Sequence, residues 1–171
     1  MSKSAVVLGV PHQLQGRRFQ GFVEDPSYSI FVKSLMHDVD FVFEEASGRG
    51  PSIAGELAGS FHRLVQYVDI DPPRDERPKY GIPMEVAGGG AIDPCNSSDV
   101  YEYARIDGQR LREELWLHCV LSKPFEKGLV IVGLAHSLSF GFRLLSAGVS
   151  VHDEIYQYTP YNKLCTRSHE S

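Results

Sequence analysis

Two apolar runs rich in β-branched residues constrain the fold of this chain more than any other feature. They span Ala5–Val10 and Leu129–Gly133. A strand that is apolar at every position is buried on both faces, and such strands belong to parallel sheets covered by helices on both sides. These two runs therefore predict a layered α/β protein with a sheet at its centre.

Shorter strand patterns and helical patterns alternate between and around these two runs. Strands are predicted at 41–43, 66–70 and 149–151, and helices after Asp25, after Pro51, over about 99–122 and around Phe140. Helical crossovers between strands imply a mainly parallel sheet. We expect an α/β fold of three layers, in which helices cover both faces of a five-stranded sheet of order 3-2-1-4-5.

The length and composition predict one domain over residues 1–171. The 171 residues are enough for a single core, and 42% hydrophobic with 23% charged residues is typical of a globular protein. An irregular loop rich in Pro and Gly spans 72–97, and we expect a flexible tail from about 160. Such a loop is a lid, a binding loop or a mobile surface insertion.

Charge and cysteine content narrow the classes of partner. The net charge of −5 and the lack of a dense Lys/Arg run argue against nucleic acid, and the longest apolar stretch is too short to span a membrane. Cys95, Cys119 and Cys165 show no CxxC spacing, which predicts free thiols in a reducing, cytoplasmic setting. We expect a small-molecule or peptide substrate, with a homo-oligomer left open.

A Gly-x-x-His segment follows each of the two apolar runs. The segments are Gly9-Val10-Pro11-His12 and Gly133-Leu134-Ala135-His136. Each histidine then lies just past the carboxyl end of a buried strand, which is the edge where α/β proteins build their sites. If the two strands are neighbours, His12 and His136 face one crevice, although a single histidine in this place is often only a structural hydrogen-bonding group.

Two adjacent carboxylates, Glu44 and Glu45, end the second predicted strand. Successive side chains of a strand point to opposite faces, so one of the two is expected to reach the crevice, and Glu44 ranks slightly ahead. His12, His136 and Glu44 would suit a divalent transition metal with open positions for water. Glu45 would then steer a proton, and without a metal the same set could act as general base and general acid.

The long predicted helix carries several charged residues, namely Arg105, Arg110, Arg112, Glu113 and Glu114. Most charged residues of this helix are expected to face solvent in i,i+4 pairs. A sharper hypothesis has one arginine of this helix crossing to the site, where it would hold a carboxylate ligand or an anionic transition state. Asp69 and Asp71 could extend a metal site, but an Asp close before Pro is as often part of a turn that ends a strand.

These residues together resemble the TraB/Tiki/ChaN/erythromycin-esterase-like superfamily. The resemblance covers about Val6 to Val151 and is carried by the two GxxH segments with FVFEEASG and LVIVGLAHSLSF. It implies that His12, Glu44 or Glu45, and His136 are site residues, with Arg112 and Glu113 as additions. The first segment has Val-Pro where a Thr is common, and the chain is short for the superfamily and shows no export signal or anchor, which argues against proteolysis.

The resemblance implies a site but several reactions. The superfamily includes metal-dependent proteases, metal-independent esterases and a haem-binding lipoprotein. Our leading hypothesis is a metal-dependent hydrolase of the TraB/Tiki-like type with its site at the carboxyl edge of the sheet. The alternatives are a non-catalytic protein that binds haem, metal or a small ligand on the same scaffold, and a purely structural role for both histidines.

Overall fold

Five parallel strands form the centre of the molecule. The computed structural model describes residues 2–16, 21–47, 50–62, 64–82 and 99–156. The strands are β1 (Ser4–Val10), β2 (Phe41–Glu44), β3 (Gln66–Asp69), β4 (Lys127–Gly133) and β5 (Ser150–Ile155). They pair in parallel throughout, which confirms the predicted α/β class.

The strand order is β3-β2-β4-β1-β5 and differs from the predicted 3-2-1-4-5 by an exchange of the two apolar strands. β1 and β4 are neighbours as expected, with Val10 opposite Gly133. However, β4 and not β1 lies beside β2. A β-carbon on Gly128 of β4 would lie 3.2 Å from the ring of Phe43 in β2, so this glycine makes room for the aromatic side chain. Hydrophobicity alone does not distinguish two equally apolar strands, and this local fit is a tertiary property.

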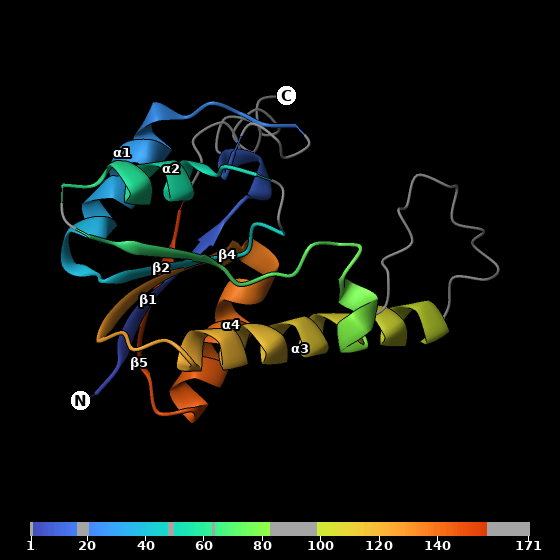
Figure 1. Cartoon of the computed structure of the whole chain (residues 1–171). Coiled ribbons are helices and arrows are strands. Elements are labelled where there is room, and N and C mark those ends of the chain that lie inside the picture. Colours follow the sequence, from blue (N-terminus) through green and yellow to red (C-terminus); the bar gives the residue numbers. More distant parts are fainter. Residues whose placement is uncertain (1, 17–20, 48–49, 63, 83–98, 157–171) are drawn as a thin grey trace, which may run out of the picture.

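Helices cover both faces of the sheet, so the predicted three layers are confirmed (Figure 1). The helices are α1 (Pro26–Leu35), α2 (Ile53–Ser60), α3 (Asp99–Leu121) and α4 (Leu134–Ser146). α1 and α2 pack on one face, and α3 and α4 pack on the other. Short 3-10 helices follow β1 (η1, His12–Leu14), α1 (η2, Met36–Asp38) and the turn after β3 (η3, Arg77–Tyr80).

α2 differs most from its sequence pattern. The predicted apolar face included Ile53, Leu57, Phe61 and Leu64, but the helix ends at Ser60 and Leu64 is 85% exposed. Its buried residues are Ala54 and Ala58. Small side chains on the inner face allow the helix to lie close to the sheet, so burial here follows the available space rather than side-chain size.

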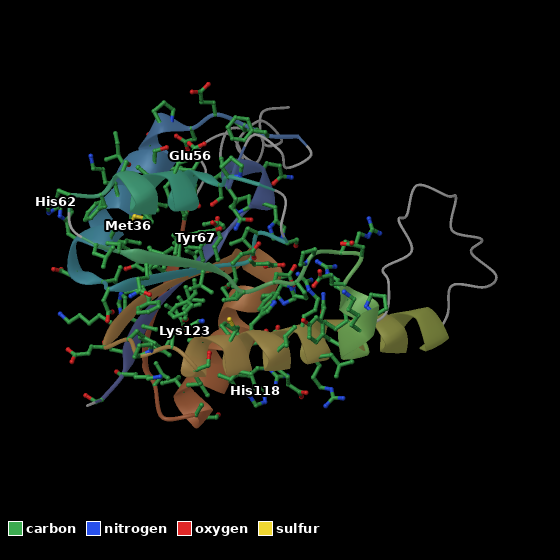
Figure 2. The ribbon with its side chains drawn as sticks, in the orientation of Figure 1. Met36, Glu56, His62, Tyr67, His118 and Lys123 are labelled. Atoms are coloured by element: carbon green, nitrogen blue, oxygen red, sulfur yellow. The ribbon has the colours of Figure 1, made fainter. Side chains whose placement is uncertain are left out.

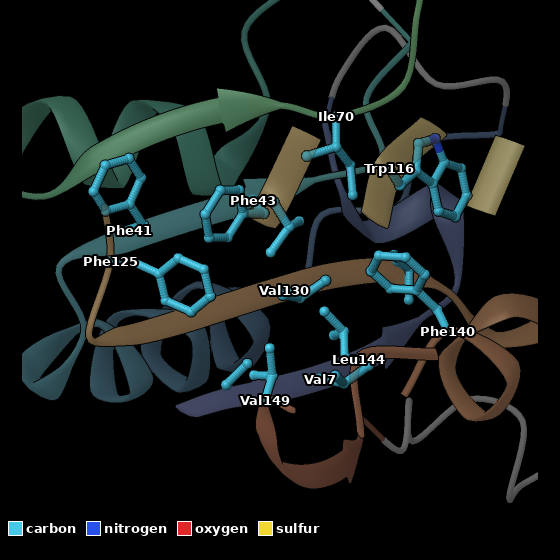
Figure 3. Close-up of a cluster of buried hydrophobic side chains, with 13 residues drawn as sticks. Val7, Phe41, Phe43, Ile70, Trp116, Phe125, Val130, Phe140, Leu144 and Val149 are labelled. Atoms are coloured by element: carbon cyan, nitrogen blue, oxygen red, sulfur yellow. The ribbon is translucent and has the colours of Figure 1, made fainter. Parts of the chain in front are cut away.

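The buried Phe and Trp side chains of the described residues gather on the face covered by α3 and α4 (Figure 3). Phe41 and Phe43 stack with ring centroids 5.5 Å apart, and Phe125 meets Phe43 edge-on. Trp116 of α3 and Phe140 of α4 close the same core near the carboxyl edge of the sheet. This packing fixes α3 against the edge where β4 ends, and so brings its polar side chains to the site.

The two Gly-x-x-His strands leave the sheet in opposite directions. β1 leads through η1 toward the α1 layer, whereas β4 continues directly into α4 on the other face. Adjacent parallel strands with helices on opposite faces define a topological switch point, which is where open α/β sheets bind ligands. The β1–β4 pair therefore marks the candidate site.

The loop predicted at 72–97 is described over 72–82, where it contains η3 and the buried Arg77. Its remainder, and the tail predicted from about 160, lie outside the described residues. Within the ranges that the structure describes, every helix is too short or too polar to cross a membrane.

Candidate functional site

His12 lies at the carboxyl end of β1, against the backbone of Gly133 in the neighbouring strand. A β-carbon at position 133 would be 2.6 Å from Nε2 of His12 and 2.8 Å from Cε1. No other residue type has room there, so glycine is required for the imidazole to take this place. The His12 side chain is 47% exposed, and Nε2 lies 3.8 Å from Oε1 of Glu45.

The glycine of the other segment has the same purpose. A β-carbon on Gly9 would lie 2.8 Å from the hydroxyl of Ser137, the residue after His136. Each Gly-x-x-His segment thus uses its glycine to admit a side chain at or next to the histidine of the other. This is a more specific role than an open strand exit, and it packs the two segments against each other.

Glu45 connects three elements at this edge. Its Oε2 accepts a hydrogen bond of 2.8 Å from the backbone N–H of Gly133, and its Oε1 accepts one of 2.5 Å from Arg112 of α3. The side chain is only 3% exposed. The backbone N–H and the guanidinium each donate to one oxygen of this buried carboxylate, so its position and its orientation toward His12 are fixed.

Arg112 bridges Glu45 and a second buried carboxylate, Asp71. Its Nε donates to Asp71 over 3.0 Å, and its guanidinium lies 4.9 Å from the centre of the Trp116 ring. Burial lowers the pKa of this guanidinium, but Glu45 and Asp71 raise it above its ordinary value. Arg112 therefore stays charged, and it is an arginine of α3 that reaches Glu45 and Asp71.

Asp71 is the most heavily bonded carboxylate in this network. It accepts from Trp116 Nε1 over 3.0 Å and from Arg77 over 2.7 Å, as well as from Arg112 and the hydroxyl of Ser47. Burial raises the pKa of Asp71, yet Arg112 and the hydrogen bonds lower it below the ordinary value. The residue anchors Arg112, a role distinct from both the metal ligand and the simple turn residue considered from sequence.

His136 forms a second polar pair with Glu113. Nδ1 of the histidine lies 2.8 Å from Oε1 of Glu113, and the ring packs edge-on against Trp116 with centroids 5.0 Å apart. Ser139 and Arg143 donate to the same carboxylate. Burial raises the pKa of Glu113, but these bonds and His136 lower it below the usual range. The charged Glu113 requires a proton on Nδ1, which leaves the lone pair of the neutral ring on Nε2.

Glu44 points to the opposite side of the sheet, toward α2, and is fully buried. It accepts hydrogen bonds from Ser52, from Tyr67 over 2.9 Å and from Gln15 over 3.2 Å. Tyr67 reaches it from β3 on the side covered by α1 and α2 (Figure 2). Burial raises the pKa of Glu44 to about 7, against the effect of these donors.

The structure thus brings His12, Glu45 and Arg112 together and places His136 with Glu113 on the adjoining strand exit. Glu44 does not contact His12 directly. The sequence favoured Glu44 over Glu45 as the carboxylate that faces the crevice, but in the structure it is Glu45 that lies beside His12. Among the residues described, no group of three or more His, Cys, Asp or Glu side chains is arranged to hold a metal ion.

Several polar residues of this network were not among the candidates from sequence, and Gln15 and Trp116 are two of them. Asp71 was considered as a metal ligand or a turn residue, but not as an anchor for Arg112. The only local signal was the position of Gln15, three residues after His12, where a short helical turn returns its side chain to the histidine. Asp71 and Trp116 are 45 residues apart in the chain, and no local pattern joins them.

Comparisons with family profiles, with curated proteins and with solved structures found no match. The site is therefore described by its own chemistry. It offers one half-exposed histidine beside a fixed carboxylate, and one buried histidine held by a second carboxylate. Two histidines with distinct anchors are suited to general acid–base work or to binding through Nε2.

Proposed function

We propose that this chain is a hydrolase related to the TraB/Tiki-like superfamily, with its site at the carboxyl edge of the β1–β4 pair. One observation carries the proposal: His12, half exposed, lies 3.8 Å from the buried carboxylate of Glu45, which Arg112 and Gly133 hold in place. A positioned histidine beside a fixed carboxylate is the pattern of a general base. The superfamily resemblance of the two GxxH segments supports the same choice.

In the proposed reaction, His12 takes a proton from water as the water attacks a carbonyl carbon of a small-molecule or peptide substrate. Glu45 lies 3.8 Å from Nε2, the nitrogen that receives the proton. Arg112 keeps Glu45 oriented. The imidazolium of His12 then gives this proton to the leaving group, as a catalytic imidazole acts first as base and then as acid. The neutral His136, held by Glu113, offers the lone pair of its Nε2 to orient the attacking water.

The metal expected from sequence would need His12, His136 and Glu44 as ligands, and this donor set does not fit. Glu44 is turned to the far face and already accepts three hydrogen bonds. Glu45, the carboxylate beside His12, is bound by a guanidinium, whose positive charge opposes a second cation at the same oxygen. The proposed steps therefore involve only side chains and water.

The test is a screen with aryl esters and short peptides on His12→Gln, Glu45→Gln and His136→Gln. We expect each to lower kcat/KM by roughly 10²-fold or more. His118→Gln is the matched control, because His118 is exposed on the outer side of α3 (Figure 2). Undiminished turnover in all three site variants would refute the proposal. Turnover that chelators abolish, with stoichiometric metal in the purified protein, would restore the metal-dependent hypothesis.

A ligand-binding role is the second candidate. The observation in its favour is that His12 and His136 both have Nδ1 on a side-chain oxygen, an arrangement typical of histidines that bind a metal or haem iron through Nε2. Titration with haemin would then give an absorbance band that His136→Ala removes. For either function we propose a reducing compartment such as the cytoplasm, because the three cysteines show no CxxC spacing and are expected to be free thiols.

A further inference from the structure

Gln15 is a fully buried amide that lies between His12 and Glu44. Its backbone is held at both ends. The N–H donates to the carbonyl of His12 over 3.1 Å, and the carbonyl accepts from the N–H of Ile53 at the start of α2 over 2.7 Å. The side chain therefore starts from a fixed point.

The orientation of the Gln15 amide follows from its neighbours. Nε2 lies 3.2 Å from a carboxylate oxygen of Glu44 and 3.3 Å from the backbone carbonyl of Glu45. A carbonyl oxygen only accepts, so this side of the amide must be the NH₂ group. The opposite orientation would place the amide oxygen against two acceptors. Oε1 must then face His12, whose Nδ1 is 2.6 Å away.

An amide oxygen facing Nδ1 requires the proton on that nitrogen. In the neutral ring the lone pair then belongs to Nε2, the atom that lies toward Glu45. We propose that Gln15 is a positioning residue that holds His12 as the Nδ1–H tautomer, and that Glu44 serves to hold Gln15. The catalytic importance of this arrangement rests on the hydrolase function proposed above, whereas the tautomer itself does not.

This assignment explains why a glutamate is buried on the far face, away from the crevice. Glu44 accepts from Ser52 and Tyr67 in addition to Gln15, so the carboxylate is fixed before it acts on the amide. Hydrogen bonds in a chain polarise each other, and the chain from Nδ1 of His12 through Gln15 to Glu44 makes Nε2 a better proton acceptor. Adjacent glutamates thus act on one histidine from two sides, Glu45 directly and Glu44 through Gln15.

The experiment is NMR of the ring nitrogens of His12, at a pH where the ring is neutral. In the unaltered protein we expect a protonated Nδ1 and an unprotonated Nε2. Gln15→Met removes the acceptor at nearly equal volume and should shift His12 toward a mixture of tautomers. Glu44→Gln keeps an acceptor for Gln15 and should retain the Nδ1–H form. The exposed His118 should give the same signals in every variant.

An Nε2–H tautomer of His12 in the unaltered protein overturns the inference, as does an unchanged tautomer in a folded Gln15→Met. If Gln15→Met does not fold, the unaltered protein and Glu44→Gln decide the question. Gln15→Met should lower kcat roughly 10²-fold or more. In protein that already carries His12→Gln, adding Gln15→Met should not lower kcat further, because the histidine that Gln15 positions is absent. If the tautomer is as expected but His12→Gln, Glu45→Gln and His136→Gln all leave hydrolysis unaffected, the hydrolase proposal fails and the inference stands.

Discussion

The imidazole of His12 occupies the space that a β-carbon of Gly133 would fill, with Nε2 2.6 Å from that position. The two residues are far apart in the chain and belong to different Gly-x-x-His segments. Their contact is possible because β1 and β4 are adjacent and in a register that sets Val10 beside Gly133. The glycine of one segment thus defines where the histidine of the other can lie.

Gly133→Ala should displace the His12 ring from Glu45 and Gln15, because the new methyl group and the imidazole cannot share this space. We expect a loss of about 1–3 kcal/mol in the free energy of unfolding, together with an altered NMR environment of His12. Gly59→Ala is the matched control: it lies in α2 with nothing within 4 Å of the new β-carbon. There, alanine should stabilise the helix by up to about 1 kcal/mol. Equal effects of the two substitutions, with His12 unmoved, would contradict this contact.

Arg112→Met should cost about 3 kcal/mol or more of unfolding free energy, measured by denaturant titration. The change leaves Glu45 and Asp71 buried without their shared cation. Arg110→Met, two residues away on the same helix, removes an exposed ion pair with Glu114. We expect it to change stability by no more than about 0.5 kcal/mol. If Arg112→Met and Arg110→Met lowered the free energy of unfolding by similar amounts, the buried ion pairs of Arg112 would contribute little to stability.

Glu44→Gln should alter how stability depends on pH. Burial raises the pKa of Glu44 to about 7 from the ordinary 4.5. A carboxyl with a raised pKa in the folded state contributes stability that is full below 4.5 and is lost as the pH rises through 7. The loss across this window is roughly 3 kcal/mol. Thermal or denaturant unfolding at several pH values should show a smaller decline in Glu44→Gln than in the unaltered protein. An equal decline would mean that another group titrates there.

Asp71→Asn should alter how the free energy of unfolding depends on pH in the acid range, with the sign opposite to that of Glu44→Gln. The pKa of Asp71 is lowered despite its burial, because Arg112, Arg77 and Ser47 bind its charged form. Such a group contributes stability that is present above its unfolded pKa and is lost as the pH falls through the folded value. The variant should therefore be less stable at neutral pH and lose less on acidification. Parallel acid-unfolding curves for the two proteins would contradict this assignment.

Much of the fold could be predicted from local patterns. The apolar runs of β1 and β4 required a sheet covered on both faces, and the Asp25-Pro26 pair marked the start of α1, where Asp25 accepts from the N–H of Ser27. These features depend on neighbours in the chain. The end of α2 and the position of β4 beside β2 depend on the space between packed elements, which no local pattern records.

The candidate residues show the same division. His12, Glu45 and His136 were accessible to sequence reasoning, because polar residues that follow buried strands are conspicuous. Arg112 and Glu113 became candidates through the superfamily resemblance and not through a local pattern. The partner of each residue was not accessible. Glu44 and Glu45 are adjacent, and only the direction in which the strand meets its neighbours decides which of them faces His12.

The sequence by itself determined that a parallel sheet would form and that both Gly-x-x-His segments would end at its carboxyl edge, since burial of apolar runs and side-chain alternation are local consequences of residue type. The tertiary structure alone decided that His12 lies over Gly133, that Arg112 joins Glu45 to Asp71, and that Gln15 stands between His12 and Glu44. Those relationships require distances of a few ångströms between residues up to 121 positions apart in the chain (Gly133 and His12). Such distances are set by strand register and helix packing, which depend on all the layers together.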